Sequence, residues 1–92
     1  MAIEVRVPTI LRTYTDGEKK VSATGDSVSA LIEDLEANHA GIKDRLLEDG
    51  QPRRFVNIYV NDEDIRFSGG LETPLSDGDI VVILPAVAGG AR

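Results

Sequence analysis

The chain has 92 residues, a formal net charge of −6 at pH 7 and no cysteine. This length suffices for one domain with a modest core and is too short for two domains or a deeply enclosed active site. The acidic balance argues against nucleic acid and anionic membranes as partners, because both would repel the chain. The lack of cysteine excludes disulfides, thiol nucleophiles and cysteine-based zinc sites. No segment resembles a signal peptide or a membrane span, so we expect a cytoplasmic protein.

Two strands are predicted at the start of the chain. Apolar and charged residues alternate over Ile3–Val7, which is typical of a strand with one buried face, and Pro8 restricts its continuation. The region Leu11–Gly17 is expected to form a turn. Glu18–Ala23 then returns as a second strand.

The clearest helix follows. Val28, Leu31, Ile32 and Leu35 have the spacing of one helical face, and Ser27 or Asp26 is suited to cap the N-terminus. The helix is expected to end between Asn38 and Gly41, where His39 would act as a capping or solvated residue rather than as a catalyst. A short second helix is expected over residues 42–47 and a loop over residues 48–54.

The second half of the chain predicts three more strands. Phe55–Val60 is rich in β-formers, and the turn Asn61–Asp64 should connect it to Ile65–Phe67. Leu71–Leu75 is expected to be a turn or a brief 3₁₀ segment. Ile80–Leu84 is apolar on both faces, which indicates a central strand with a parallel neighbour. The predicted fold is α+β, a β-grasp (ubiquitin-like) mixed sheet with one main helix packed across it.

The end of the chain changes in character. Residues 1–87 are predicted to form the domain, and residues 88–92 are predicted to form a flexible tail that carries Gly89 and Gly90. Ala86 to Gly90 can reach about 17 Å when extended. Two glycines let bare backbone enter a narrow channel and leave the acyl carbon of Gly90 open to attack. Taken alone, a terminal diglycine is also what a frayed chain end looks like.

Several segments together resemble the ThiS/MoaD family of ubiquitin-like sulfur carriers. They are Phe55–Arg66, Leu75–Asp79, Ile83–Gly90, Val7–Arg12 and Asp34–Asn38. Within the family, the resemblance is strongest to the carriers of actinobacterial cysteine biosynthesis, and it covers nearly the whole chain.

The resemblance implies a protein cosubstrate rather than an enzyme, with no cofactor and no metal of its own. An E1-like enzyme would adenylate the carboxylate of Gly90, sulfide would convert it into a thiocarboxylate, and Ala88 and Gly89 would thread into the partner's active site. A PLP-dependent synthase would accept the sulfur, and a metal-dependent C-terminal hydrolase would release the product. The free protein is expected to be a monomer.

One departure from the family is the ending. Family carriers end at the second glycine, whereas Ala91 and Arg92 follow it here. Some relatives carry such a cap as a proform, so Ala91 and Arg92 are interpreted as a removable cap. The alternative is an added remnant or a natural end that stays uncut.

Other residues and functions stay open. Arg53, Arg54 and Arg66 are either a basic patch or ordinary surface charge. Val87 with Phe55 and Phe67 would form an apolar docking patch, although core packing is expected for the two aromatics. The sulfur acceptor could equally belong to thiosugar, thiamine or molybdopterin synthesis. A ubiquitin-like modifier and a plain interaction module remain the competing functions.

Overall fold

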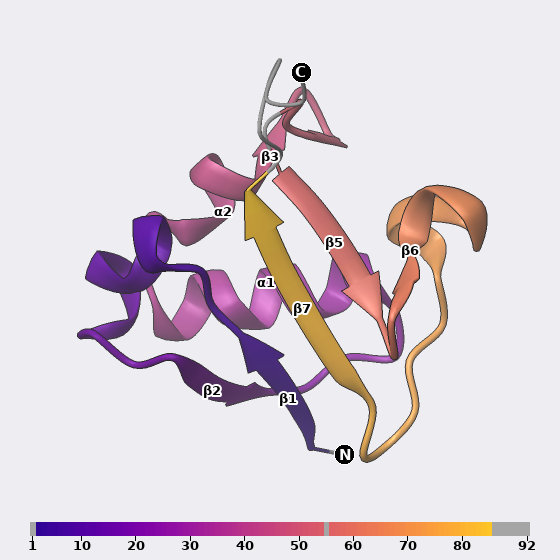
Figure 1. Cartoon of the computed structure of the whole chain (residues 1–92), viewed down its shortest axis with the longest axis horizontal. Helices are drawn as coiled ribbons and strands as arrows, with labels where there is room; N and C mark the ends of the chain where they lie inside the picture. The colour runs from indigo at the N-terminus through magenta and orange to yellow at the C-terminus, as the bar shows by residue number, and fades with distance from the viewer. Residues whose placement is uncertain (1, 55, 86–92) are drawn as a thin grey trace.

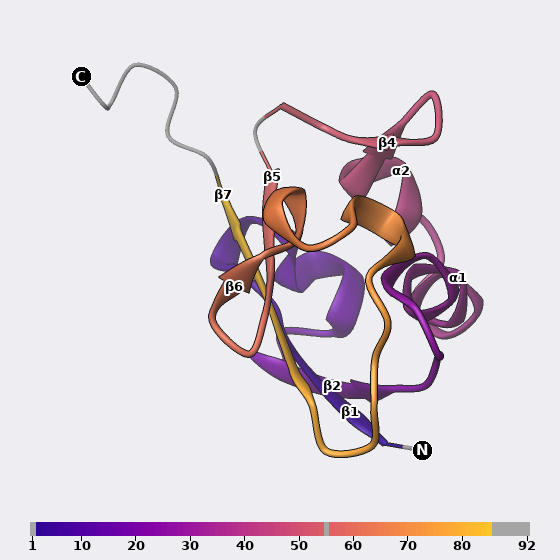
Figure 2. The same ribbon diagram turned by 90° about the vertical axis from the view of Figure 1, so that its right-hand side faces the viewer.

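The computed structural model describes residues 2–54 and 56–85. The elements in chain order are β1 (Ile3–Arg6), the 3₁₀ helix η1 (Thr9–Thr15), β2 (Lys20–Ala23), α1 (Val28–Asn38), α2 (Ile42–Leu46), β3 (Leu47–Glu48), β4 (Gln51–Pro52), β5 (Val56–Val60), β6 (Glu63–Asp64), the 3₁₀ helices η2 (Ile65–Phe67) and η3 (Gly70–Glu72), and β7 (Ile80–Pro85). Helix α1 lies across one face of the main sheet (Figures 1 and 2). None of these helices is long and apolar enough to cross a membrane.

The main sheet is mixed and has the strand order β2-β1-β7-β5-β6. Strand β7 lies in its centre, parallel to β1 and antiparallel to β5. This confirms the prediction from its two apolar faces, because a strand with neighbours on both sides and a covered face loses most contact with water. The arrangement is the predicted β-grasp.

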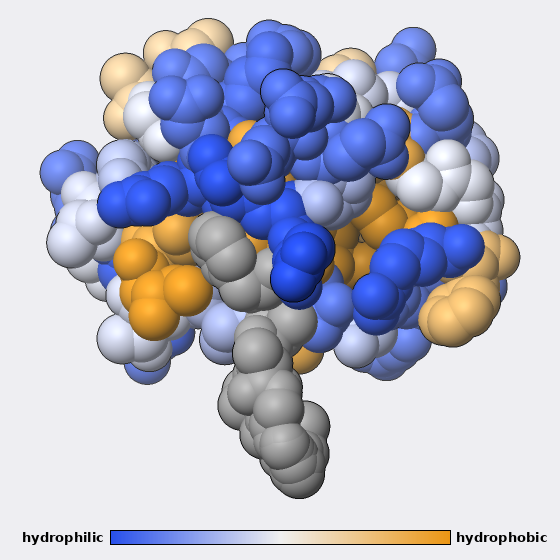
Figure 3. All heavy atoms as spheres, turned by 90° about the horizontal axis from the view of Figure 1, so that it is seen from above, coloured by the Kyte–Doolittle hydropathy of each residue, from blue (hydrophilic) through white to orange (hydrophobic). Residues whose placement is uncertain are grey.

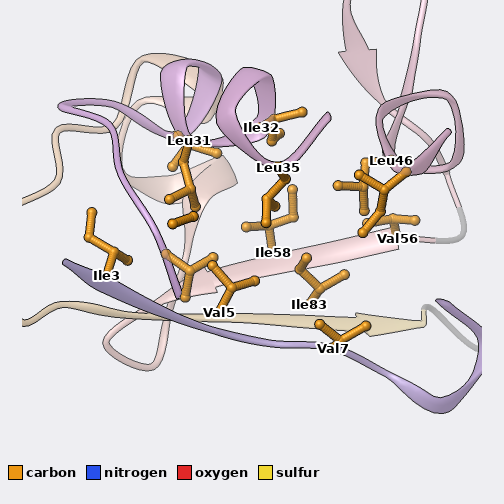
Figure 4. Close-up of a cluster of buried hydrophobic side chains, with 14 of the residues drawn as sticks. Ile3, Val5, Val7, Leu31, Ile32, Leu35, Leu46, Val56, Ile58 and Ile83 are labelled. Carbon is orange, nitrogen blue, oxygen red and sulfur yellow. The ribbon is translucent and has the colours of Figure 1, made fainter. Parts of the chain in front are cut away.

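The core lies between α1 and the covered face of the sheet. The four residues of the predicted helical stripe, Val28, Leu31, Ile32 and Leu35, are each exposed by 2% or less. Figure 4 shows the side chains of Leu31 and Leu35 directed toward the sheet, which contributes buried residues from β1, β5 and β7. Burial of each such side chain stabilises the fold by about 1.5–3 kcal/mol.

The ends of α1 agree with the sequence analysis. The hydroxyl of Ser27 accepts a hydrogen bond from the backbone amide of Ala30 at 3.2 Å, so Ser27 is the N-cap. The helix ends at Asn38, and the amide of His39 donates to the carbonyl of Leu35 at 2.7 Å.

Residues 48–54 were expected to be a loop, and that expectation is wrong in part. A hairpin pairs Leu47 with Pro52 and Glu48 with Gln51. Its two-residue turn has positive φ at both Asp49 (54°) and Gly50 (77°). The twist of such a turn matches that of the paired strands, and Asp-Gly is a preferred sequence for it because both residues tolerate positive φ.

The hairpin after β5 also differs from its prediction. The returning strand is Glu63–Asp64, and the turn is Asn61-Asp62, with φ of 50° and 73°. Ile65–Phe67 forms η2 instead of a strand. The carboxylate of Asp64 accepts a hydrogen bond from the backbone amide of Arg66, which begins a helical turn.

This change decides where the apolar side chains of η2 lie. Ile65 is buried, whereas Phe67 is 81% exposed. The expectation that Phe67 packs in the core is therefore wrong.

Two connecting segments are short 3₁₀ helices. η1 occupies much of the region expected to be a turn and buries Leu11 and Thr15, while the turn itself follows at Asp16 and Gly17, both with positive φ. η3 overlaps the start of Leu71–Leu75, which was expected to be a turn or a brief 3₁₀ segment.

Candidate functional site

The candidate site is the end of the sheet at which β7 stops. Pro85, the last described residue, lies opposite Val56 of β5. The predicted site residues lie outside the described residues: Ala88, Gly89, Gly90, Ala91 and Arg92. The predicted domain boundary at 87 and the docking residues Val87 and Phe55 also lie outside them. The structure therefore describes the surface next to the predicted tail.

A hollow of about 420 Å³ lies on the β1 side of this end, and we call it the β1 groove. It is lined by Arg6, Val7, Pro8, Arg12, Lys19, Lys20, Val82, Ile83 and Leu84. The groove arises where β1 leaves the sheet, because Pro8 ends the extended run and begins η1. Arg12 is held beside it by a hydrogen bond from its Nε to the carbonyl of Val7 at 3.1 Å.

A second hollow of about 280 Å³ lies on the β5 side, and we call it the β5 hollow. Among its lining residues are Arg53, Arg54 and Arg66, so the structure brings the predicted basic patch together. Arg53 has a structural role as well, because its Nε donates to the carbonyl of Asp44 at 2.6 Å.

Arg66 is held in a defined place by two neighbours. Its Nη2 lies 2.6 Å from Oδ2 of Asp64 and 3.1 Å from Oδ1 of Asn57. The Asp64 side chain is 9% exposed and the Arg66 side chain 66% exposed. The hydrogen bond from Arg66 lowers the pKa of the Asp64 carboxyl, so Asp64 stays charged and keeps Arg66 across the surface of β5.

Positive charge is concentrated at this end of an acidic protein. Seven of the ten Lys and Arg residues in the chain line the two hollows, against one of the sixteen Asp and Glu residues. Figure 3 shows this end of the molecule, where strongly hydrophilic side chains lie beside apolar patches. Such a segregation of charge favours an acidic binding partner at this surface.

The described residues offer little for catalysis. None of the groups of His, Asp and Glu among them could hold a metal ion. His39 lies at the end of α1, as predicted. Asp79 accepts hydrogen bonds from the side chain of Asn61 at 3.0 Å and the amide of Ser76 at 2.8 Å, which lower its pKa and identify it as a turn residue.

The comparison with family models decides the relationship. The model described as the ThiS family matches residues 5–90. The chain belongs to the ThiS family. The sulfur carrier protein CysO of Mycobacterium tuberculosis is 61% identical to this member, over 98% of this chain and 100% of the relative. The crystal structure of that CysO matches with a TM-score of 0.90 and 60% identity, over 92% of this chain and 99% of the other.

Two further relatives extend the comparison of this ThiS-family chain. The crystal structure of the Amycolatopsis orientalis BexX/CysO complex contains a chain that is 60% identical, with a TM-score of 0.92 over 97% of this chain and 100% of that one. Small archaeal modifier protein 3 of Haloferax volcanii is 34% identical over 98% of this chain and 100% of the relative. These matches confirm the family resemblance and the β-grasp fold.

The cations of the β1 groove in this ThiS-family member were not predicted from the sequence. Arg6, Arg12 and the pair Lys19-Lys20 are separated in the sequence, and pairing of β1 with β2 brings them together. The alternation of each strand could have indicated them. Arg6 and Lys20 fall between the apolar residues of two strands expected to be neighbours, so both side chains are predicted on the outward face of the sheet.

Proposed function

We propose that this chain is a sulfur carrier protein whose Gly90 becomes a C-terminal thiocarboxylate and donates sulfur in biosynthesis, with cysteine as the product. The observation that carries the proposal is the 61% identity to CysO over almost the whole chain, together with a family match that extends to residue 90. The central position of β7 supports it, because pairing with β1 as far as Val82 and with β5 as far as Pro85 anchors the residues that follow.

The first step of the proposal is removal of Ala91 and Arg92. Water adds across the Gly90–Ala91 peptide bond, so that Gly90 gains a carboxylate and Ala91 an amine. A metal-dependent hydrolase supplies this step. Residues 88–90 then act as the working tail, and residues 1–87 as the domain that partners recognise.

The second step is activation, because a carboxylate is a poor electrophile. An E1-like enzyme joins the Gly90 carboxylate to the AMP part of ATP and releases pyrophosphate. Sulfide attacks the acyl carbon, a C–S bond forms, and the C–O bond to AMP breaks with AMP leaving. Gly89 and Gly90 carry no side chain that would block this attack.

The third step is transfer in the cytoplasm to the acceptor of a PLP-dependent synthase. The thiocarboxylate sulfur would add to the β-carbon of an aminoacrylate derived from O-phosphoserine, which joins Gly90 to the new cysteine as a thioester. The amine of that cysteine would then attack the Gly90 carbonyl, the acyl C–S bond would break to free the thiol, and Gly90 would end as an amide of the new cysteine. Hydrolysis of that amide returns the carrier. The chain is thus consumed and regenerated as a protein cosubstrate.

Intact-mass spectrometry tests the proposal. The chain ending at Gly90 is incubated with ATP, sulfide and an E1-like enzyme. In a parallel control reaction, the same enzyme forms the thiocarboxylate of M. tuberculosis CysO. We expect a mass increase equal to the exchange of one oxygen for sulfur, located on Gly90. The 92-residue chain should gain this mass only after losing Ala91 and Arg92. An unchanged mass of the trimmed chain, with CysO charged alongside, contradicts the proposal.

A second candidate is a ubiquitin-like modifier, favoured by the 34% identity to small archaeal modifier protein 3. The same activated Gly90 would then form an amide with lysines of other proteins. Conjugates that survive a denaturing gel and disappear when residues 89–92 are deleted would support this candidate. A plain interaction module would keep its function after that deletion.

A further inference from the structure

The β1 groove is a place where β7 loses one of its two neighbours. The pairing of β7 with β1 ends at Arg6 opposite Val82, whereas its pairing with β5 continues to Pro85 opposite Val56. The amide of Val7 donates to the carbonyl of Lys19 at 2.8 Å, so the chain stays beside β2 at this point while it leaves β7. The last residues of β7 therefore border an opening that runs along the strand.

The opening has an apolar floor. Val82, Ile83 and Leu84 of β7 line it together with Val7 and Pro8. Leu84 is 44% exposed, which is unusual for a leucine within a central strand. A hollow of about 420 Å³ accommodates a few side chains of a bound segment.

The rim of the groove is basic. Arg6 and Lys20 lie directly opposite each other on β1 and β2, and Lys19 and Arg12 complete the rim. Like charges at directly opposite positions of a sheet destabilise it. Glu4 offsets part of this repulsion, since its Oε2 lies 2.7 Å from Nε of Arg6. None of the lining residues is Asp or Glu, so a bound carboxylate would find Arg12, Lys19 and Lys20 at the rim and would compete with Glu4 for Arg6.

We propose that the β1 groove binds an extended, acidic segment of the E1-like enzyme that acts on Gly90. The apolar floor would receive an apolar side chain of that segment, and Asp or Glu residues beside it would pair with the rim. Gly90 is the fifth residue after Pro85, at most about 17 Å of chain away. A segment held in the groove thus keeps the enzyme within reach of the glycine. That the partner is the E1-like enzyme rests on the proposed function, whereas the binding of an acidic segment in the groove does not.

The first test needs no enzyme. A peptide of alternating Glu and Leu is titrated into the isotope-labelled 92-residue chain, and backbone amide shifts are recorded. We expect shifts at Arg6, Lys20, Val82 and Leu84, and none with the matching Lys-Leu peptide. In K19S/K20S the affinity should fall about fivefold. Absence of shifts in the groove, or equal binding by the Lys-Leu peptide, overturns the proposal.

A matched control separates the groove from general charge. The variant K43S/R45S also removes two cations, but both lie on α2 and outside the two hollows: Lys43 pairs with Glu33, and Nε of Arg45 donates to the hydroxyl of Tyr14. Its affinity for the Glu-Leu peptide should stay within about twofold of the unmodified chain. A loss equal to that of K19S/K20S would show a general effect of net charge and overturn the proposal.

The second test uses the E1-like enzyme and ATP–pyrophosphate exchange on chains that end at Gly90. We expect K19S/K20S to lower kcat/KM about fivefold, mostly through KM, with the difference shrinking at high salt. Equal kcat/KM for K19S/K20S and K43S/R45S contradicts the proposal even if thiocarboxylate forms normally. If no thiocarboxylate forms with any chain, the proposed function fails, and the peptide titration still decides the groove.

Discussion

Asp64 accepts two kinds of hydrogen bond from Arg66: one from its backbone amide at 2.9 Å and one from its guanidinium at 2.6 Å. The first begins η2 and the second holds Arg66 at the β5 hollow. A single carboxylate thus sets both the backbone after β6 and the position of one cation near the end of β7. Its charge and its capping role can be separated by substitution.

The charge of Asp64 should make stability depend on pH. Its pKa is lowered in the folded state, mainly by Arg66, so its contribution is present above the ordinary carboxyl pKa and is lost as the pH falls through the folded value. Asp64→Asn keeps an oxygen that can cap η2 and removes the charge. We expect D64N to lower the free energy of unfolding at pH 7 by about 0.5–1 kcal/mol.

Urea unfolding at several pH values checks this expectation. The difference between D64N and the unmodified chain should shrink as the pH falls below about 4, where an ordinary Asp is protonated. A difference that stays constant from pH 7 to about pH 2 would mean that the charge of Asp64 contributes nothing to stability.

The N-cap of α1 gives a second prediction. Ser27→Ala removes the acceptor for the amide of Ala30 and should cost about 1 kcal/mol of unfolding free energy. Ser29→Ala is the matched control, because Ser29 lies inside the same helix, where alanine is favoured by a few tenths of a kcal/mol. Urea midpoints at an unchanged m-value should fall for S27A and not for S29A. Equal midpoints for the two variants would exclude Ser27 as a stabilising cap.

Gly25 gives a third prediction, because it lies against the first turns of α1. A Cβ built there would be 2.5 Å from the amide nitrogen of Leu31 and 2.9 Å from the carbonyl carbon of Ala30, both backbone atoms of the core helix. Gly25→Ala should therefore push α1 from the sheet and cost about 3 kcal/mol.

Gly17→Ala is the control for that clash. Gly17 has a positive φ of 84° but nothing within 4 Å of its added Cβ. Only the backbone strain should remain, about 1 kcal/mol. Thermal unfolding of both variants checks the comparison, and a Gly25→Ala protein as stable as Gly17→Ala would show that α1 adjusts at no cost.

Much of the fold could be predicted from local patterns. The spacing of Val28, Leu31, Ile32 and Leu35 predicts both α1 and the face it buries, and the structure confirms both. The apolar run Ile80–Leu84 predicts the central strand in the same way. The helical pattern is visible because its four residues are buried against the same layer, whereas in β7 Val81 and Ile83 are buried and Leu84 is exposed.

Short elements escaped prediction for a physical reason. Strands β3, β4 and β6 have two residues each, too few for an alternating pattern to appear. Strand β6 also carries Glu63 and Asp64, which are poor strand formers. Its pairing with Tyr59 and Val60 depends on the turn at Asn61-Asp62.

The sequence by itself determined the layers of this protein, the central place of β7 and the diglycine on which the proposed function rests. Only the tertiary structure decided what surrounds the end of β7. Arg6 and Lys20 are distant in the sequence and become direct neighbours through the register of β1 and β2, and β1 turns away after Arg6 to open the groove. Buried residues recur with the period of their helix or strand and can therefore be recognised in the sequence. Which exposed charges become neighbours depends on strand register, which local patterns do not show.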